Sequence, residues 1–239
     1  MNLNVSLSNV LFLDIETVPE YENWSLLSDT SKELFEQKTA YQRKDETSPE
    51  DFYERAGIWA EFGKVICISV GYFVGKKDQK KLRVKSFYGD DEKVVLTEFK
   101  ELLDAHFSYA NKLLCAHNGK EFDFPFLARR MIVHHITLPK KLNLFGKKPW
   151  EVAHLDTMDL WKFGDYKHYS SLKLLTHTLG IPSPKDDIDG SDVARIYYQE
   201  KDIDRIVKYC EKDTIAVAQL LQRFNNEDIV KENEIEYID

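Results

Sequence analysis

Four acidic residues and one tyrosine, spread over three short stretches of the chain, are of the types that hold divalent cations and position water. The first stretch, LFLDIETVPE at 11–20, ends an apolar strand with Asp14 and Glu16. Because side chains alternate along a strand, Leu11 and Leu13 should face one way while the two acids share the opposite face. Neighbouring carboxylates repel each other, and near a core they also lose hydration. Such a pair is either solvated at the end of a strand or balanced by a bound cation.

The other two stretches place acids on predicted helices. In HNGKEFDFPFLARR at 117–130, Asp123 lies just inside a helix, whose positive N-terminal end favours a carboxylate. In YCEKD at 209–213, Tyr209 and Asp213 are four residues apart and therefore share one helix face. Taken singly, each stretch also has a purely structural interpretation. Asp123 could be an ordinary acid of a first helical turn, and Tyr209 a packed side chain beside an exposed acid.

Together, DIET at 14–17, HNGKEFDFPFL at 117–127 and YCEKD at 209–213 resemble the three ordered motifs of DEDDy-type 3'-5' exonucleases. The likeness is closest to the proofreading exonuclease domain of family B DNA polymerases and to stand-alone bacterial proteins described as predicted exonucleases of that kind. It covers most of residues 8–224, including EFGKVICISVGYF at 61–73. The second motif is the most specific, because it matches N-G-x-x-F-D-x-P-x-L throughout. The resemblance implies a ribonuclease H-like fold, a two-metal active site and a nuclease module without polymerase palm or thumb.

Phosphodiester hydrolysis explains why these residue types belong together. It requires an activated water and a stabilised leaving 3'-oxygen, and two divalent ions about 4 Å apart provide both. Mg²⁺ and Mn²⁺ prefer oxygen ligands, so carboxylates suit this chemistry better than His or Cys. The expected metal ligands, which are also catalytic, are Asp14, Glu16, Asp123 and Asp213. Their four negative charges would balance the charge of two such cations.

Tyr209 is the fifth catalytic candidate, since it lies one helical turn before Asp213 and can orient the attacking water. A sister class carries a histidine five residues before its last acid. That position is Lys208 here, and no histidine lies between Gly180 and Asp213. The tyrosine class therefore fits the sequence and the histidine class does not.

Three residues beside the motifs are candidate substrate contacts. By resemblance only, Thr17 would offer its backbone to the 3' end. Asn118 would hold the terminal nucleotide or brace Asp123. Phe122 would stack on the terminal base, because aromatic stacking accepts every base, or pack in the core. We expect Asp156 to be a helix N-cap or a residue behind the ligands rather than a ligand.

Hydrophobic periodicity supplies the elements that must position these residues. It predicts strands at 10–15, 64–74, 81–88 and 112–117. It predicts helices at 93–108, 121–135, 156–163, 170–180, 191–199 and 202–224. Strands followed by alternating helices and a strand indicate an α/β fold with a mixed central sheet flanked by helices. Helical patterns near 29–41 and 49–59 indicate a helical insertion after the first strand.

The expected organisation is one exonuclease domain over 1–225, with an insertion at 19–63, and an acidic C-terminal tail at 226–239. The tail holds six acids and one lysine, so it carries five of the eight net negative charges. The remaining body is close enough to neutral to leave a nucleic-acid partner open. The sequence gives no indication of a protein partner.

Composition narrows the class of protein further. A hydrophobic content of 43% with 13% aromatic residues is typical of a folded chain. No apolar run approaches the roughly 18 residues of a membrane span, so no membrane association is expected. The three cysteines form no C-x-x-C pair and predict reduced thiols in a cytoplasmic protein.

The leading hypothesis is a metal-dependent 3'-5' exonuclease that acts on the 3' ends of single-stranded DNA. One alternative is the same chemistry on RNA or short oligoribonucleotides, because DNA and RNA are distinguished by contacts to the 2'-hydroxyl that a sequence does not reveal. The other is a catalytically silent nucleic-acid-binding module. The presence of all four acids and the tyrosine argues against that second alternative.

Overall fold

The computed structural model describes residues 5–43, 47–75, 80–165, 169–182 and 188–238. Six strands in this part of the chain form one sheet in the order β5-β4-β1-β2-β3-β6. The strands are β1 (Val10–Pro19), β2 (Gly63–Val74), β3 (Lys81–Tyr88), β4 (Leu113–Ala116), β5 (Leu155–Asp156) and β6 (Ile235–Tyr237). β2 runs antiparallel to β1 and to β3, whereas the other neighbours are parallel. The sheet is therefore mixed, as predicted.

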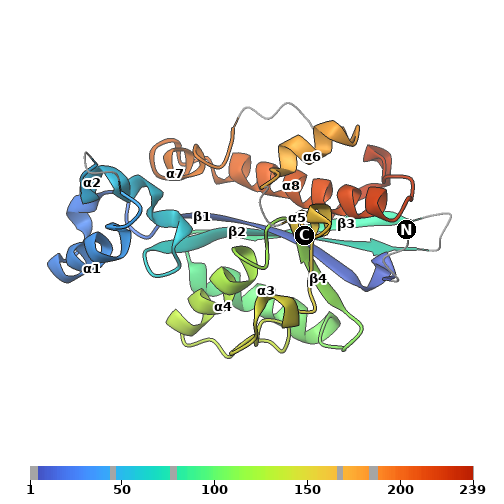
Figure 1. Cartoon of the computed structure of the whole chain (residues 1–239), viewed down its shortest axis with the longest axis horizontal. Helices are drawn as coiled ribbons and strands as arrows, with labels where there is room; N and C mark the ends of the chain where they lie inside the picture. The colour runs from blue at the N-terminus through green and yellow to red at the C-terminus, as the bar shows by residue number, and fades with distance from the viewer. Residues whose placement is uncertain (1–4, 44–46, 76–79, 166–168, 183–187, 239) are drawn as a thin grey trace.

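Helices cover both faces of this sheet (Figure 1). They are α1 (Asp29–Thr39), α2 (Pro49–Phe52), α3 (Glu92–His106), α4 (Asp123–Val133), α5 (Thr157–Lys162), α6 (Leu172–Thr178), α7 (Val193–Arg195) and α8 (Ile203–Phe224). Short 3₁₀ helices occur at Leu7–Asn9, Trp24–Leu26, Tyr53–Ile58, Pro149–Glu151 and Glu232–Glu234. α6, α7 and α8 lie on one side of the sheet, and α3 and α4 lie on the other. The prediction of an α/β fold with a flanked mixed sheet is confirmed.

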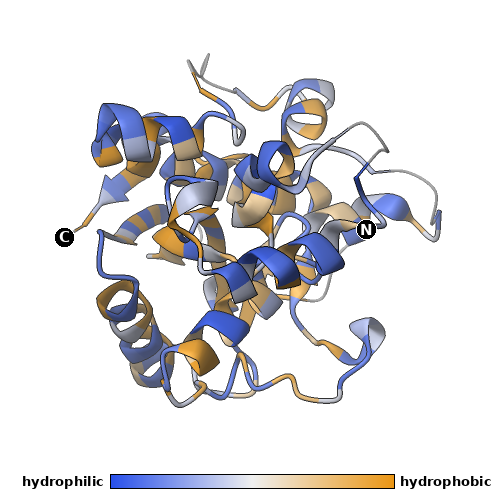
Figure 2. Ribbon diagram, turned by 90° about the vertical axis from the view of Figure 1, so that its left-hand side faces the viewer, coloured by the Kyte–Doolittle hydropathy of each residue, from blue (hydrophilic) through white to orange (hydrophobic). Residues whose placement is uncertain are grey.

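β1 separates two hydrophobic cores, as its alternating sequence predicts. Leu11 and Leu13 are fully buried in the core formed with α3 and α4, whereas Phe12 is fully buried in the core on the α8 side. Hydrophobic segments accordingly lie toward the sheet, and the outward sides of the helices are largely hydrophilic (Figure 2). Asp14 and Glu16 therefore extend from β1 toward α8.

The structure departs from the predicted elements in four places. β1 continues to Pro19, past its predicted end at residue 15, because it pairs with β2 along its whole second half. The predicted helix at 191–199 divides into α7 and a π-helical turn at Ile196–Glu200. β5 and β6 were not predicted, since strands of two and three residues show no measurable periodicity.

Between β1 and β2, residues 19–63 contain α1, α2 and the 3₁₀ helix at Tyr53–Ile58. Phe35 is fully buried at the centre of a local aromatic cluster that also contains Trp24, Tyr53, Trp59 and Phe62. These helices sit beyond one end of β1 and β2 (Figure 1). The predicted helical segment is thus built around its own small core.

The segment at 226–239 joins the sheet through β6, which pairs in parallel with β3. Glu236 accepts from Lys81 and Arg83 on that strand, with Nζ–Oε1 and Nε–Oε2 distances of 2.5 and 3.1 Å. The basic stretch KKDQKKLRVK at 76–85 is therefore neutralised in part by Glu236, and residues 76–79 of this stretch lie outside the described residues. The acidic tail thus pairs with basic residues of the protein's own sheet.

Candidate active site

The carboxylates of Asp14 and Glu16 face α8, whose residues approach β1 closely. The Cys210 thiol of α8 donates to the backbone oxygen of Asp14 at 3.3 Å. Burial raises the pKa of Asp14 well above its usual value, and the charges of Glu16, Asp213 and Asp123 raise it further. Glu16 is 8% exposed, and its pKa is also raised well above normal by burial and by Asp213. The structure thus brings the four predicted acids together.

Asp123 reaches this cluster from the opposite face of the sheet, because β4 is shorter than β1. β4 pairs with β1 only as far as Phe12, so the backbone N–H of Ile15 has no partner strand on that side. The Asp123 carboxylate accepts that N–H, while α4 packs against the core below. Burial raises the pKa of Asp123 to about 7, with a further contribution from Asp156, against the opposing effect of the hydrogen bonds it accepts.

The turn that carries Asp123 depends on a glycine and on a buried acid. A Cβ at Gly119 would lie 2.4 Å from the Cβ of Ala116, so only glycine fits this close approach. Asp156 is 2% exposed and accepts the backbone N–H groups of Asn118 and Lys120, each at 3.0 Å. It also accepts from Met158 N at 2.9 Å and so caps α5. The prediction that Asp156 is a helix N-cap is confirmed.

Tyr209 lies on α8 beside the acids, one turn before Asp213. Its hydroxyl hydrogen-bonds the Asp213 side chain. Burial raises the pKa of Tyr209 far above its usual range, and the charges of Asp213, Glu16 and Asp14 act in the same direction. The hydroxyl therefore stays neutral and retains a proton that it can donate. Lys208, at the position of the sister class's histidine, is exposed.

The three candidate substrate contacts have different surroundings. Thr17 donates its hydroxyl to Gly57 O at 2.8 Å, which ties β1 to the inserted segment. Asn118 adopts a left-handed backbone conformation with φ of 64°, and its buried Oδ1 has no hydrogen-bond partner among the described residues. Phe122 is half-buried, with its ring centroid 5.4 Å from that of Phe126. Their contacts with substrate stay predictions, and packing of Phe122 against the core is observed.

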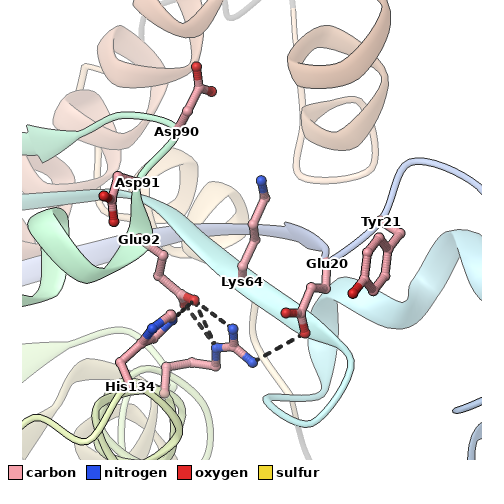
Figure 3. Close-up of a pocket in the computed structure, with 8 residues that line it drawn as sticks. Glu20, Tyr21, Lys64, Asp90, Asp91, Glu92 and His134 are labelled. Atoms are coloured by element: carbon pink, nitrogen blue, oxygen red, sulfur yellow. Dashed lines mark hydrogen bonds and ion pairs between the residues drawn. The ribbon is translucent and has the colours of Figure 1, made fainter. Parts of the chain in front are cut away.

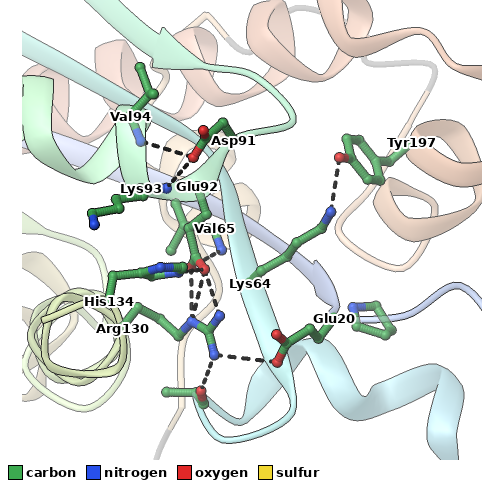
Figure 4. A network of polar contacts seen from close by, with 12 residues as sticks. Glu20, Lys64, Val65, Asp91, Glu92, Lys93, Val94, Arg130, His134 and Tyr197 are labelled. Atoms are coloured by element: carbon green, nitrogen blue, oxygen red, sulfur yellow. Dashed lines mark hydrogen bonds and ion pairs between the residues drawn. The ribbon is translucent and has the colours of Figure 1, made fainter. Parts of the chain in front are cut away.

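Sequence analysis missed a buried ion-pair network behind the site (Figure 4). The pairing of β1 and β2 shifts between Glu16 and Thr17. Val65 lies beyond the last pair of β2 with β3, and its N–H donates to Glu92 Oε1 at 2.7 Å. Arg130 is 2% exposed and donates to Glu92 Oε2 at 2.6 Å and to Ala60 O at 2.9 Å. Glu92 thereby joins the irregular part of β2 to α3 and α4. In the sequence, Arg130 follows Arg129, and two adjacent arginines are more typical of a solvated surface than of a buried ion pair.

This network also lines an open hollow of about 530 Å³ beyond the end of β1 (Figure 3). Lys64 points into the hollow and donates to the Tyr197 hydroxyl at 3.1 Å, and that hydroxyl donates to Asp90 at 2.6 Å. The Tyr197 hydroxyl thus bridges Lys64 and Asp90, while Glu92 pairs with Arg130. None of the four clustered acids lines it, so the hollow and the carboxylate site are separate features of the molecule.

The carboxylate cluster has the donor set that a divalent cation requires. One ligand atom each from Asp14, Glu16 and Cys210 lie within 4.8 Å of one another. No described residue donates a hydrogen bond to the buried Glu16 carboxylate, although a buried charge without a partner is costly. A cation would supply the missing partner, and the carboxylate oxygens suit Mg²⁺ or Mn²⁺. These residues therefore fit a metal site.

Residues 58–230 match the family model described as a predicted 3'-5' exonuclease related to the exonuclease domain of PolB, and the chain belongs to that family. Among solved structures, the family B DNA polymerase from the hyperthermophilic archaeon Pyrobaculum calidifontis is similar, with a TM-score of 0.53 and 15% sequence identity. The likeness covers 90% of this chain and 24% of the polymerase. At this low sequence identity it is a similarity of fold. Together with the mixed sheet, it confirms the ribonuclease H-like fold. Among the described residues, no helix is long and apolar enough to cross a membrane.

Proposed function

We propose that the protein is a divalent-metal-dependent 3'-5' exonuclease that removes nucleotides from the 3' ends of single-stranded DNA. The observation that carries the proposal is the convergence of four acids and Tyr209 in a member of an exonuclease family. Three of these acids have raised pKa values because burial and the charges of nearby carboxylates disfavour their charged forms. A site with so much uncompensated negative charge is suited to holding cations.

Asp14, Glu16, Asp123 and Asp213 would hold the cations. When bound, two such ions activate the attacking water and stabilise the leaving 3'-oxygen. Asp123 is fixed by the Ile15 N–H and by the start of α4, so its carboxylate has little freedom to turn away. Asp213 in turn fixes the Tyr209 hydroxyl.

Tyr209 would orient the water rather than remove its proton. Its raised pKa keeps the hydroxyl protonated at neutral pH, so a general-base role is disfavoured. A neutral hydroxyl that is already hydrogen-bonded can hold a water in a defined direction through its oxygen. This positioning role predicts an effect on turnover that is larger than any effect on nucleic-acid binding.

The test is digestion of labelled single-stranded DNA, double-stranded DNA and RNA in Mg²⁺, Mn²⁺ or EDTA. We expect mononucleotides from free 3' ends, no activity in EDTA, and no cleavage of a circular single strand. The variant Asp213→Asn should be inactive. The control variant Asp104→Asn, which changes an exposed acid, should retain activity. Cleavage of the circle, or full activity in EDTA, would contradict the proposal. Faster digestion of RNA would reassign the substrate, and metal-independent binding without cleavage would indicate a silent module.

A further inference from the structure

Cys210 places a sulfur atom at the carboxylate cluster, which the oxygen chemistry of the proposed reaction does not require. The residue is fully buried, and its thiol hydrogen-bonds the Asp14 side chain in addition to the Asp14 backbone oxygen. Its Sγ atom and carboxylate oxygens of Asp14 and Glu16 all lie within 4.8 Å of one another. Glu16, the nine-tenths-buried member of this group, accepts no hydrogen bond from a described residue. Three potential ligand atoms, two of them carboxylate oxygens, thus lie close to one another.

A second thiol lies next to Cys210. Cys67 lies opposite Glu16 in the register of β1 and β2, and its thiol hydrogen-bonds that of Cys210. Both cysteines pack with Val207 in one buried cluster. Hard cations such as Mg²⁺ gain little from sulfur, whereas borderline and soft cations bind thiolates preferentially. The side of the site nearest α8 therefore offers a donor that discriminates between classes of metal.

We propose that Asp14, Glu16 and Cys210 form a mixed oxygen and sulfur site for a thiophilic divalent cation, such as Zn²⁺, Co²⁺ or Cd²⁺. On binding, the cation replaces the thiol proton, which leaves to solvent, and a metal–sulfur bond forms. Because two of the ligands are shared with the proposed catalytic metals, the thiophilic cation excludes them and inhibits the enzyme. The inhibition rests on the proposed function, but the binding itself does not.

Binding is tested with the metal alone, without nucleic acid, on the full-length protein. Co²⁺ bound to a thiolate gives a near-ultraviolet charge-transfer band that carboxylate ligands do not give. We expect this band in the wild type and in Cys115→Ser, whose thiol is equally buried but lies on β4 in a different cluster. Cys210→Ser should lose the band and bind Cd²⁺ at least about 10-fold more weakly, since loss of even an outer-shell group costs about 10- to 100-fold. Calorimetry gives the Cd²⁺ affinities.

A wild-type protein that binds Co²⁺ without the thiolate band would overturn the proposal, and this result needs no variant. Retention of the band in Cys210→Ser would also overturn it. Thermal melting shows whether the serine variant is folded, and Cys210→Ala replaces it if it is not. In the nuclease assay, the Zn²⁺ concentration that halves Mg²⁺-supported activity should rise at least about 10-fold in Cys210→Ser relative to Cys115→Ser. An inactive wild type that shows the band would refute the exonuclease and leave the metal site standing.

Discussion

Replacement of Asp123 by asparagine should stabilise the metal-free protein at neutral and higher pH. The folded-state pKa of Asp123 is about 7, against an ordinary value of 3.8. Below about pH 4 the carboxyl is protonated in both the folded and the unfolded chain, so it costs nothing. Between about pH 4 and 7 only the unfolded chain releases the proton, and the free energy of unfolding falls by about 1.4 kcal/mol per pH unit. The accumulated loss is at most about 4 kcal/mol at pH 7 and above.

Asparagine has no proton to release and keeps an oxygen that can accept the Ile15 N–H. The variant should therefore be more stable than the wild type by up to about 4 kcal/mol in EDTA at about pH 8, and the difference should nearly vanish at about pH 4. Relief of repulsion at Asp14, which also senses the Asp123 charge, acts in the same direction. Urea unfolding followed by circular dichroism at both pH values measures this difference.

The matched control is Asp104→Asn, which removes a carboxylate from an exposed pair with Lys100 on α3. Such a surface pair contributes at most about 0.5 kcal/mol, so the control should follow the wild type at both pH values. Saturating Mn²⁺ should restore the wild type by about 3 kcal/mol at a concentration 100 times the dissociation constant, and the Asp123 variant by much less. If the Asp123 variant were less stable than the wild type at about pH 8 without metal, burial of an unbalanced carboxylate would be the wrong explanation.

Three further outcomes are expected. Tyr209→Phe keeps the ring but should lower single-turnover cleavage by roughly 10- to 1,000-fold, with DNA affinity in Ca²⁺ little changed; a wild-type rate would remove the hydroxyl from the mechanism. Gly119→Ala should destabilise the protein in urea by about 1–3 kcal/mol because no space exists for the methyl group, whereas Gly190→Ala, with nothing within 4 Å, should be nearly neutral. Glu92→Gln should cost about 3–5 kcal/mol, since it leaves the buried Arg130 with only its longer ion pair, 3.6 Å to Glu20, and a loss under 1 kcal/mol would show that the network is dispensable.

Local patterns predicted the parts of the site that depend on one element at a time. The alternation of β1 placed Asp14 and Glu16 on one face, and helical spacing placed Tyr209 one turn from Asp213. The capping role of Asp156 followed from its position before an apolar helix. These features are fixed by backbone geometry within a few residues, and sequence periodicity reports that geometry directly.

Contacts between distant segments were not predictable in this way. Thr17 meets Gly57 through its hydroxyl, whereas the motif assigned only its backbone to the substrate. Glu92 accepts the N–H of Val65, which lies beyond the last pair of β2 with β3. Cys210 was expected to be a buried thiol, but nothing in its spacing indicated that it would face Asp14. Each of these depends on which elements become neighbours, and hydrophobic periodicity contains no information about neighbours.

The contact between Cys210 and Asp14 joins residues 196 positions apart in the chain. Contacts of such high sequence separation form slowly, because the entropy of closing the intervening loop is lost before the contact stabilises anything. The first strand and the last long helix must meet before all four acids repel one another or a cation can bind all of them. Cation binding requires this late contact, so we expect it to be absent from the folding transition state. An interaction that is absent from that state changes the unfolding rate and leaves the folding rate as it is. A divalent cation should therefore slow the unfolding of this protein while leaving its folding rate unchanged.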